Sequence, residues 1–184
     1  MPRFPVLTTD SAPEKSRETL TSLARRRGAN PLNIHAGMPN SPAVLNMYAG
    51  MSAAIAANGT FDARTREAIA LAVGAENGCG YCQSIHTMTG TAAGLTDEQT
   101  VAIRRGSPEV DPRLAALLTV ARGIAANLGE VDDHTYQAAL AAGWTTDQLA
   151  ELYAHVAANQ FTNYFNHYNG TDLDIPAAPG VLIG

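Results

Sequence analysis

The distribution of proline is the feature that most constrains the fold of this chain. All ten prolines lie outside two long tracts, residues 43–107 and 113–175. Proline interrupts helices because it lacks a backbone N–H and clashes with the preceding turn. The chain also holds 33 alanines against 17 valines and isoleucines together, and alanine favours helices whereas β-branched residues favour strands. No stretch sustains the alternation of a strand, so we predict an all-α fold.

Helix start and stop signals divide the two tracts into several helices. Ser41-Pro42, Asp62 and Asp111-Pro112 are predicted to open helices, and Asn77-Gly78 and Asn169-Gly170 are predicted to end them. Thr96 with Gln99, and Thr145 with Gln148, have the spacing of capping boxes. The proline-rich ends differ from this pattern. We therefore expect an extended lead-in over residues 1–15, one helical domain over 16–170 and a tail over 171–184.

Length and charge limit the class of protein. A chain of 184 residues suits one domain, and its formal charge of −5 argues against a nucleic acid or an anionic membrane as partner. No apolar run is long enough to span a bilayer, and the first residues lack the apolar core of a secretory signal. We therefore expect a soluble cytoplasmic protein. In that compartment the two cysteines, spaced as C-x-x-C, indicate redox or metal chemistry.

Four residues around this cysteine pair can converge. Cys82 and His86 are four residues apart and share one helix face, and Cys79 precedes Cys82 by about one turn at the start of that helix. Glu67 lies on the preceding predicted helix. Asn77-Gly78 ends that helix, and if two antiparallel helices meet at a turn near residues 76–77, Glu67 and His86 face each other across the hairpin, because both are about equally far from the turn. A carboxylate, an imidazole and two thiols then share one pocket.

This set of groups suits the reduction of hydroperoxides by a thiol. A cysteine attacks the O–O bond as thiolate and becomes a sulfenic acid, which a second thiol converts to a disulfide. Glu67 and His86 can relay the protons, and an external dithiol must then reduce the disulfide. The helix N-terminus favours Cys79 as the attacking thiolate, whereas the nearby histidine favours Cys82. The residues alone favour Cys82 only slightly.

The pattern Glu67-x11-Cys79-x2-Cys82-x3-His86 resembles the AhpD-like alkylhydroperoxidase group within the carboxymuconolactone decarboxylase superfamily. The flanking Arg66, the stretch from Asn77 to Cys82 and the lead-in Arg3-Phe-Pro-Val-Leu-Thr are also similar to this group. The resemblance covers roughly residues 41–170. Tyr81 departs from it, because the best-studied members have a second histidine between the cysteines.

The resemblance implies an all-helical bundle that assembles as a homo-oligomer, a trimer or a multiple of three. It implies that Cys82 is the peroxidatic cysteine and Cys79 the resolving one, with Glu67 and His86 as the proton relay. No metal or haem cofactor is expected. The implied reductant is a dithiol, such as a dihydrolipoyl group on a lipoylated partner protein.

Other interpretations remain open at this stage. A lyase of the decarboxylase type would need no cysteine pair. A zinc site built from Cys79, Cys82, His86 and Glu67, or a thiol switch, would make the chain a non-enzymatic module.

A polar stripe marks the last predicted helix. Tyr81, His155 and Asn159 are candidates for the lining of a pocket, and His155, Asn159 and Asn163 follow one another at helical spacing. The simpler interpretation of this stripe is the solvent-exposed side of a surface helix. His35 is expected in a loop.

Overall fold

The protein is described by a computed structural model covering residues 1–27, 30–107 and 110–181. Within these residues every regular element is helical, which confirms the predicted all-α class. The helices are α1 (Glu14–Arg27), α2 (Asn33–Gly37), η1 (Met38–Asn40), α3 (Pro42–Asn58), α4 (Ala63–Glu76), α5 (Gly80–Ala92), α6 (Asp97–Arg105), α7 (Pro112–Ala126), α8 (Asp133–Ala141) and α9 (Thr146–Asn169). In these described ranges no helix is both long and apolar enough to cross a membrane.

The ends of the helices follow the signals in the sequence. The Asp62 carboxylate accepts a hydrogen bond from the Thr65 N–H at 2.7 Å and so caps α4. Both capping boxes form, at the starts of α6 and α9. Ser41 does stand at the N-cap of α3, but its side chain makes no capping hydrogen bond. His35 lies in the short helix α2, so the expected loop at this position is wrong.

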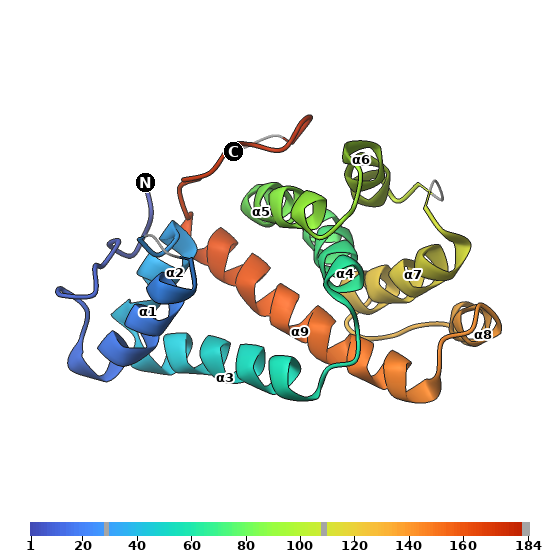
Figure 1. The fold of residues 1–184 in the computed structure, drawn as a ribbon, viewed down its shortest axis with the longest axis horizontal. Helices are drawn as coiled ribbons and strands as arrows, with labels where there is room; N and C mark the ends of the chain where they lie inside the picture. The colour runs from blue at the N-terminus through green and yellow to red at the C-terminus, as the bar shows by residue number, and fades with distance from the viewer. Residues whose placement is uncertain (28–29, 108–109, 182–184) are drawn as a thin grey trace.

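The 24-residue helix α9 connects two groups of helices. In Figure 1 it runs diagonally, with α1, α2 and α3 on one side and α4 to α8 on the other. One buried cluster lies around α4, α7 and the first half of α9, and includes Leu71, Leu117 and Leu152. A second cluster joins α1 and α3 to the start of α5 and the end of α9, and it contains both cysteines. The cysteine pair therefore lies where the two groups of helices meet the end of α9.

Both ends of the chain pack near this second cluster. The Phe4 ring stacks on Phe165 of α9 with 6.1 Å between centroids. The segment after α9 crosses α5, where the Ala178 N–H donates to the Ser84 hydroxyl at 3.1 Å. Figure 1 shows the first residues of the chain and the described segment after α9 on the same side of the molecule, with the latter segment above α5. These end segments thus border the cysteine pair.

Candidate active site

The connection from α4 to α5 positions the cysteines. Gly78 has a φ of +63°, a left-handed conformation that glycine adopts without strain. The Cys79 N–H then donates to the Gly74 carbonyl at 2.8 Å. A Cβ on Gly74 would lie 3.3 Å from the Cys82 Cβ, so this glycine lets the start of α5 pack closely against α4.

Cys79 is the N-cap residue of α5, and its sulfur accepts the Cys82 N–H at 3.2 Å. A hydrogen bond from the Cys82 thiol lowers the pKa of Cys79 from 9.0 to about 7, against the effect of burial. Burial raises the pKa of Cys82 well above its ordinary value. Both thiols are reduced and only 2% exposed. Ionisation of the pair is therefore favoured at Cys79 over Cys82.

An asparagine on α9 completes the surroundings of the sulfurs. The Asn166 side-chain Nδ2 donates to the Cys82 sulfur at 3.3 Å and lies 3.8 Å from the Cys79 sulfur. Asn166 was not among the site residues predicted from the sequence. The available signal was the polar stripe on the same helix, since Asn166 follows Asn163 by three residues and continues its face.

A pocket of about 510 Å³ opens beside Cys79. Its wall is formed by the first residue of the chain, the α4–α5 connection with the start of α5, the end of α9 and the residues that follow α9. These are Met1, Gly78, Cys79, Gly80, Tyr81, Asn166, His167, Gly170, Thr171, Asp172 and Leu173. Cys82 is not part of this wall. A ligand in the pocket would therefore meet the Cys79 sulfur first.

Glu67 and His86 lie together across α4 and α5. The His86 Nδ1 is 2.8 Å from a Glu67 carboxylate oxygen, and the Thr89 hydroxyl donates to the same oxygen at 2.5 Å. Burial alone would raise the pKa of Glu67, but the hydrogen bonds from His86 and Thr89 lower it below its ordinary value. Glu76, the other carboxylate near the motif, instead pairs with Arg122 at 3.0 Å.

The Glu67–His86 pair makes no direct hydrogen bond to the Cys79–Cys82 pair. Within the described part of the chain, the Cys82 N–H and the Asn166 amide donate hydrogen bonds to the sulfurs, and neither Glu67 nor His86 does. The set proposed as zinc ligands does not converge either, since the described residues contain no group of three or more His, Cys, Asp or Glu side chains placed to hold a metal ion.

Tyr81 binds the C-terminal segment instead of a sulfur. Its hydroxyl donates to the Asp174 carboxylate at 2.7 Å, and the same carboxylate accepts the Asn33 N–H at 3.0 Å. Burial and this carboxylate raise the pKa of Tyr81. Tyr81 thus remains neutral and holds one wall of the Cys79 pocket.

The polar stripe on α9 is buried, so its interpretation as the exposed side of the helix is wrong. His155 is 4% and Asn163 0% exposed, and Asn159 is half-buried. The Asn163 Oδ1 accepts from the Asn77 side chain at 2.9 Å, near the cysteines. Asn159 donates to the His155 carbonyl at 2.8 Å and lines neither pocket described here.

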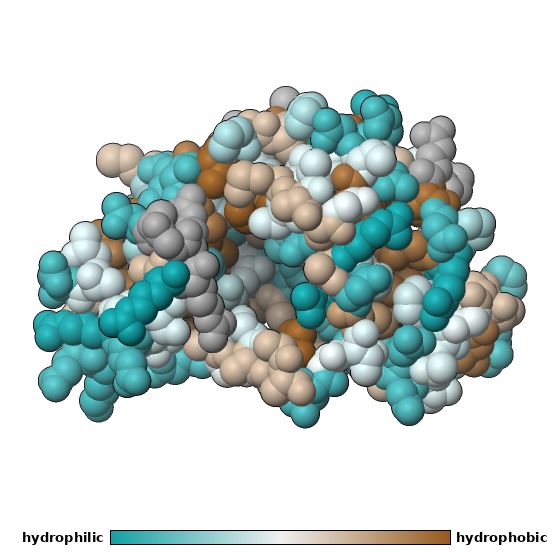
Figure 2. All heavy atoms as spheres, viewed as in Figure 1, coloured by the Kyte–Doolittle hydropathy of each residue, from teal (hydrophilic) through white to brown (hydrophobic). Residues whose placement is uncertain are grey.

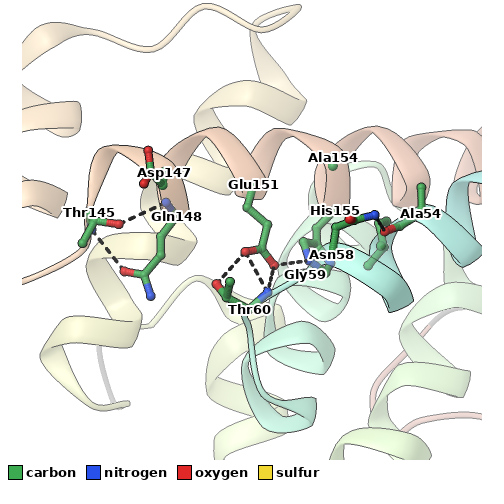
Figure 3. Close-up of a pocket in the computed structure, with 11 residues that line it drawn as sticks. Ala54, Asn58, Gly59, Thr60, Thr145, Asp147, Gln148, Glu151, Ala154 and His155 are labelled. Carbon is green, nitrogen blue, oxygen red and sulfur yellow. Dashed lines mark hydrogen bonds and ion pairs between the residues drawn. The ribbon is translucent and has the colours of Figure 1, made fainter.

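His155 belongs to a different pocket, of about 690 Å³, between the end of α3 and the first half of α9. Figure 3 shows Glu151 of α9 reaching Thr60 in the α3–α4 connection, whose N–H and hydroxyl donate to it at 2.8 and 2.6 Å. The His155 Nε2 lies 3.2 Å from the same carboxylate, and burial lowers the pKa of this histidine. Figure 2 shows a hollow near the centre of this face of the molecule, in the region between α3 and α5 of Figure 1. His155 therefore supports the α3–α4 connection and does not contact the sulfurs.

Residues 42–107 match the model of the carboxymuconolactone decarboxylase family. A comparison with curated proteins gives no significant match. The matched segment contains all four residues of the Glu-Cys-Cys-His motif.

Several solved structures share the fold. An uncharacterised peroxidase-related protein with an alkylhydroperoxidase AhpD core, from Ralstonia eutropha JMP134, has a TM-score of 0.83 at 20% identity, covering 94% of this chain and 92% of that one. A peroxidase-related protein from Silicibacter sp. TM1040 has a TM-score of 0.74 at 17% identity, covering 94% of each chain. A variant of the debrominase Bmp8 in complex with 2,3,4-tribromopyrrole has a TM-score of 0.75 at 18% identity, covering 97% of this chain and 96% of that one.

At sequence identities of 17–20%, these similarities show a shared fold and say nothing about activity. The predicted resemblance to the carboxymuconolactone decarboxylase superfamily is thus confirmed by the family match over residues 42–107, and the chain has the fold of a structure with an AhpD core.

Proposed function

We propose that this protein is a thiol-dependent hydroperoxide reductase whose redox centre is the Cys79–Cys82 pair. The observation that carries the proposal is the state of Cys79: its sulfur borders a pocket, accepts hydrogen bonds from Cys82, and has a pKa of about 7. A thiolate at neutral pH, next to a second thiol, is what peroxide reduction and disulfide formation require.

The reaction proceeds in three balanced steps. The thiolate attacks one oxygen of ROOH, the O–O bond breaks, and the products are a sulfenic acid and an alkoxide that takes a proton to become ROH. The second cysteine then attacks the sulfenic sulfur, the S–O bond breaks, and water leaves as the disulfide forms. An external dithiol supplies two electrons and two protons by thiol–disulfide exchange, which restores both thiols.

The site favours Cys79 for the first attack, although the resemblance implies Cys82. Cys79 borders the pocket and carries the favoured negative charge, whereas burial keeps Cys82 protonated. Cys82 is then the resolving thiol. The position of Cys79 at the N-cap of α5 also favours its thiolate, because the N-terminus of a helix stabilises negative charge.

Glu67 and His86 are the proposed proton relay. Because the Glu67 carboxylate holds the Nδ1 side of the imidazole, the Nε2 is left to exchange a proton with solvent or product. Neither residue hydrogen-bonds a sulfur, so we propose that the relay reaches the alkoxide through water.

The proposed reductant is a dithiol, for which a dihydrolipoyl group is the first candidate, and no metal or haem is proposed. We also propose a cytoplasmic homo-oligomer built on α3. This 17-residue helix has no charged residue and buries only Leu45, while Met47 is 57% exposed. Such an uncharged surface favours contact with a second copy of the chain.

The fold shared with the debrominase Bmp8 favours a second candidate, reductive debromination of an aromatic compound. In that reaction two thiols give two electrons to a C–Br bond, so that bromide leaves, a proton takes its place and a disulfide forms. A lyase of the decarboxylase type is a third candidate, supported by the family match.

The deciding experiment measures consumption of alkyl hydroperoxide by the purified protein with dihydrolipoamide as reductant, alongside release of bromide from a bromopyrrole. The Cys79→Ser and Cys82→Ser variants are compared, and sulfenic acid is trapped with dimedone. We expect peroxide consumption by wild type and a trapped sulfenic acid on Cys79 in Cys82→Ser. Bromide release without peroxide consumption would select the second candidate. Decarboxylation of a lactone by a variant in which both Cys79 and Cys82 are replaced by serine would select the third candidate.

A further inference from the structure

The sulfur of Cys82 accepts a hydrogen bond from an amide of α9. Asn166 is 5% exposed and its Nδ2 donates to the Cys82 sulfur at 3.3 Å, a normal length for a hydrogen bond to sulfur. The same amide lies 3.8 Å from the Cys79 sulfur. The NH2 group of one side chain, on a helix far away in the sequence, therefore contacts both sulfurs of the redox pair.

Asn163 lies one turn earlier on the same helix and is fully buried. Its Oδ1 is held by Asn77, and its Nδ2 is buried without a hydrogen-bond partner. An unpaired buried donor costs about 1–3 kcal/mol. The amides of Asn166 and Asn163 both lower the pKa of Cys82 against the effect of burial, which is the largest influence on this thiol.

The proposed reaction requires Cys82 to carry negative charge twice. It must be a thiolate when it attacks the sulfenic acid on Cys79, and it leaves as a thiolate when a dithiol attacks the Cys79 sulfur of the disulfide. A buried thiolate without hydrogen-bond donors is unfavourable. Cys79 has the N-terminus of α5 to stabilise its charge, whereas Cys82 lies inside that helix.

We propose that Asn166 is a catalytic residue, whose Nδ2 stabilises the Cys82 thiolate during disulfide formation and disulfide reduction. This inference rests on the proposed function for its place in the reaction. In resolution, the proton of Cys82 goes to the departing hydroxide as the S–S bond forms and the S–O bond breaks. In reduction, the S–S bond breaks and its electron pair passes to the Cys82 sulfur, which the amide holds until a proton returns.

The experiment removes the donor and measures the thiolate directly. In a Cys79→Ser background Cys82 is the only thiol, so the ultraviolet absorbance of thiolate against pH reports its ionisation. We expect Asn166→Leu to move this titration to higher pH, and Asn166→Gln, which keeps an amide, to restore part of the loss. In the full dithiol protein, we expect Asn166→Leu to slow disulfide formation by roughly tenfold to a hundredfold, the effect of one hydrogen bond to a charged group.

Asn169 supplies the matched control. It is a buried asparagine on the same helix, and its carbonyl side-chain oxygen accepts the Phe4 N–H at 2.8 Å. Asn169→Leu should lower stability while leaving the Cys82 titration unchanged. If Asn166→Leu does not fold, Asn166→Ala makes the same test without added bulk.

The outcomes separate this inference from the proposed function. A Cys82 titration that is the same in Asn166→Leu and in the parent overturns the inference, even if peroxide is consumed. A shifted titration in a protein that consumes no hydroperoxide supports the role of Asn166 in stabilising the thiolate and overturns the proposed substrate.

Discussion

The charge on Cys79 allows a quantitative test of the site. The hydrogen bond from the Cys82 thiol is the largest cause of the lowered pKa of Cys79. Cys82→Ala removes that thiol and keeps the backbone N–H that also donates to the Cys79 sulfur. We therefore expect the pKa of Cys79 to rise from about 7 toward its ordinary value of 9.0.

The change in reactivity follows from two opposing effects. At neutral pH, a thiol with a pKa of about 7 is about half ionised, whereas a thiol with the ordinary pKa of 9.0 is about 1% ionised. The thiolate fraction of Cys79 therefore falls by up to roughly fiftyfold in the variant. A more basic thiolate is a stronger nucleophile, with a Brønsted slope of about 0.5, which regains up to roughly tenfold. Wild-type Cys79 should therefore react up to about fivefold faster than the variant at neutral pH. In alkaline solution, where both are ionised, the variant should react faster.

The assay is alkylation of the reduced proteins by iodoacetamide across this pH range, with the label on Cys79 quantified by peptide mass spectrometry. Cys82→Ser is the matched variant, because its hydroxyl keeps a donor beside Cys79 and should give an intermediate midpoint. Superimposed pH profiles for wild type and Cys82→Ala would refute the reasoning, as would a wild-type midpoint at the ordinary value for cysteine.

Four further predictions concern residues around the site and the fold. Glu67→Gln should lower hydroperoxide turnover about a hundredfold by interrupting the proton relay, whereas Glu76→Gln, which breaks only an ion pair with Arg122, should not; equal rates would remove Glu67 from the relay. Tyr81→Phe should cost about 1 kcal/mol in urea unfolding and expose the C-terminal segment to proteases, because Asp174 loses one of its hydrogen bonds; unchanged cleavage would contradict this. Glu151→Ala should cost about 2–4 kcal/mol at neutral pH, since three donors from Thr60 and Phe61 lose their acceptor. Because hydrogen bonds hold the pKa of Glu151 below its ordinary value despite burial, this stabilisation is present above the ordinary value and is lost as pH falls through the lowered one, so the difference between the unfolding free energies should shrink in acid. Met47→Glu should dissociate the proposed oligomer in sedimentation experiments; a wild-type monomer would rule out that assembly.

The elements that could be predicted are those whose causes lie within a few residues. Asp62 and Thr96 cap their helices through donors three residues away, so sequence spacing was sufficient to predict these starts. The pairing of Glu67 with His86 was also accessible, because a short turn joins two helices of known period. Helix α2 was missed because five residues give no periodicity, and its geometry depends on packing against neighbouring helices.

The features that could not be predicted depend on contacts between distant segments. Asn166 is 84 residues from Cys82 in the sequence, and no local pattern links the two. The stripe on α9 was correctly located but assigned to the wrong environment, since polar side chains at helical spacing look the same whether they face solvent or buried partners. Burial distinguishes the two cases, because a buried amide must find partners inside the protein.

The parts of the candidate site come from segments that are far apart in the sequence. The motif on α4 and α5 supplies both sulfurs and the proposed relay, whereas α9 supplies the amides around Cys82 and the residues after it form one wall of the pocket. A change on α9 or in the C-terminal segment can therefore alter the stability of the thiolate or the shape of the pocket while the motif itself remains intact. Two chains with the same Glu-Cys-Cys-His spacing can then differ in substrate and in rate, so the residues of α9 have to be compared before an activity is transferred between proteins of this fold.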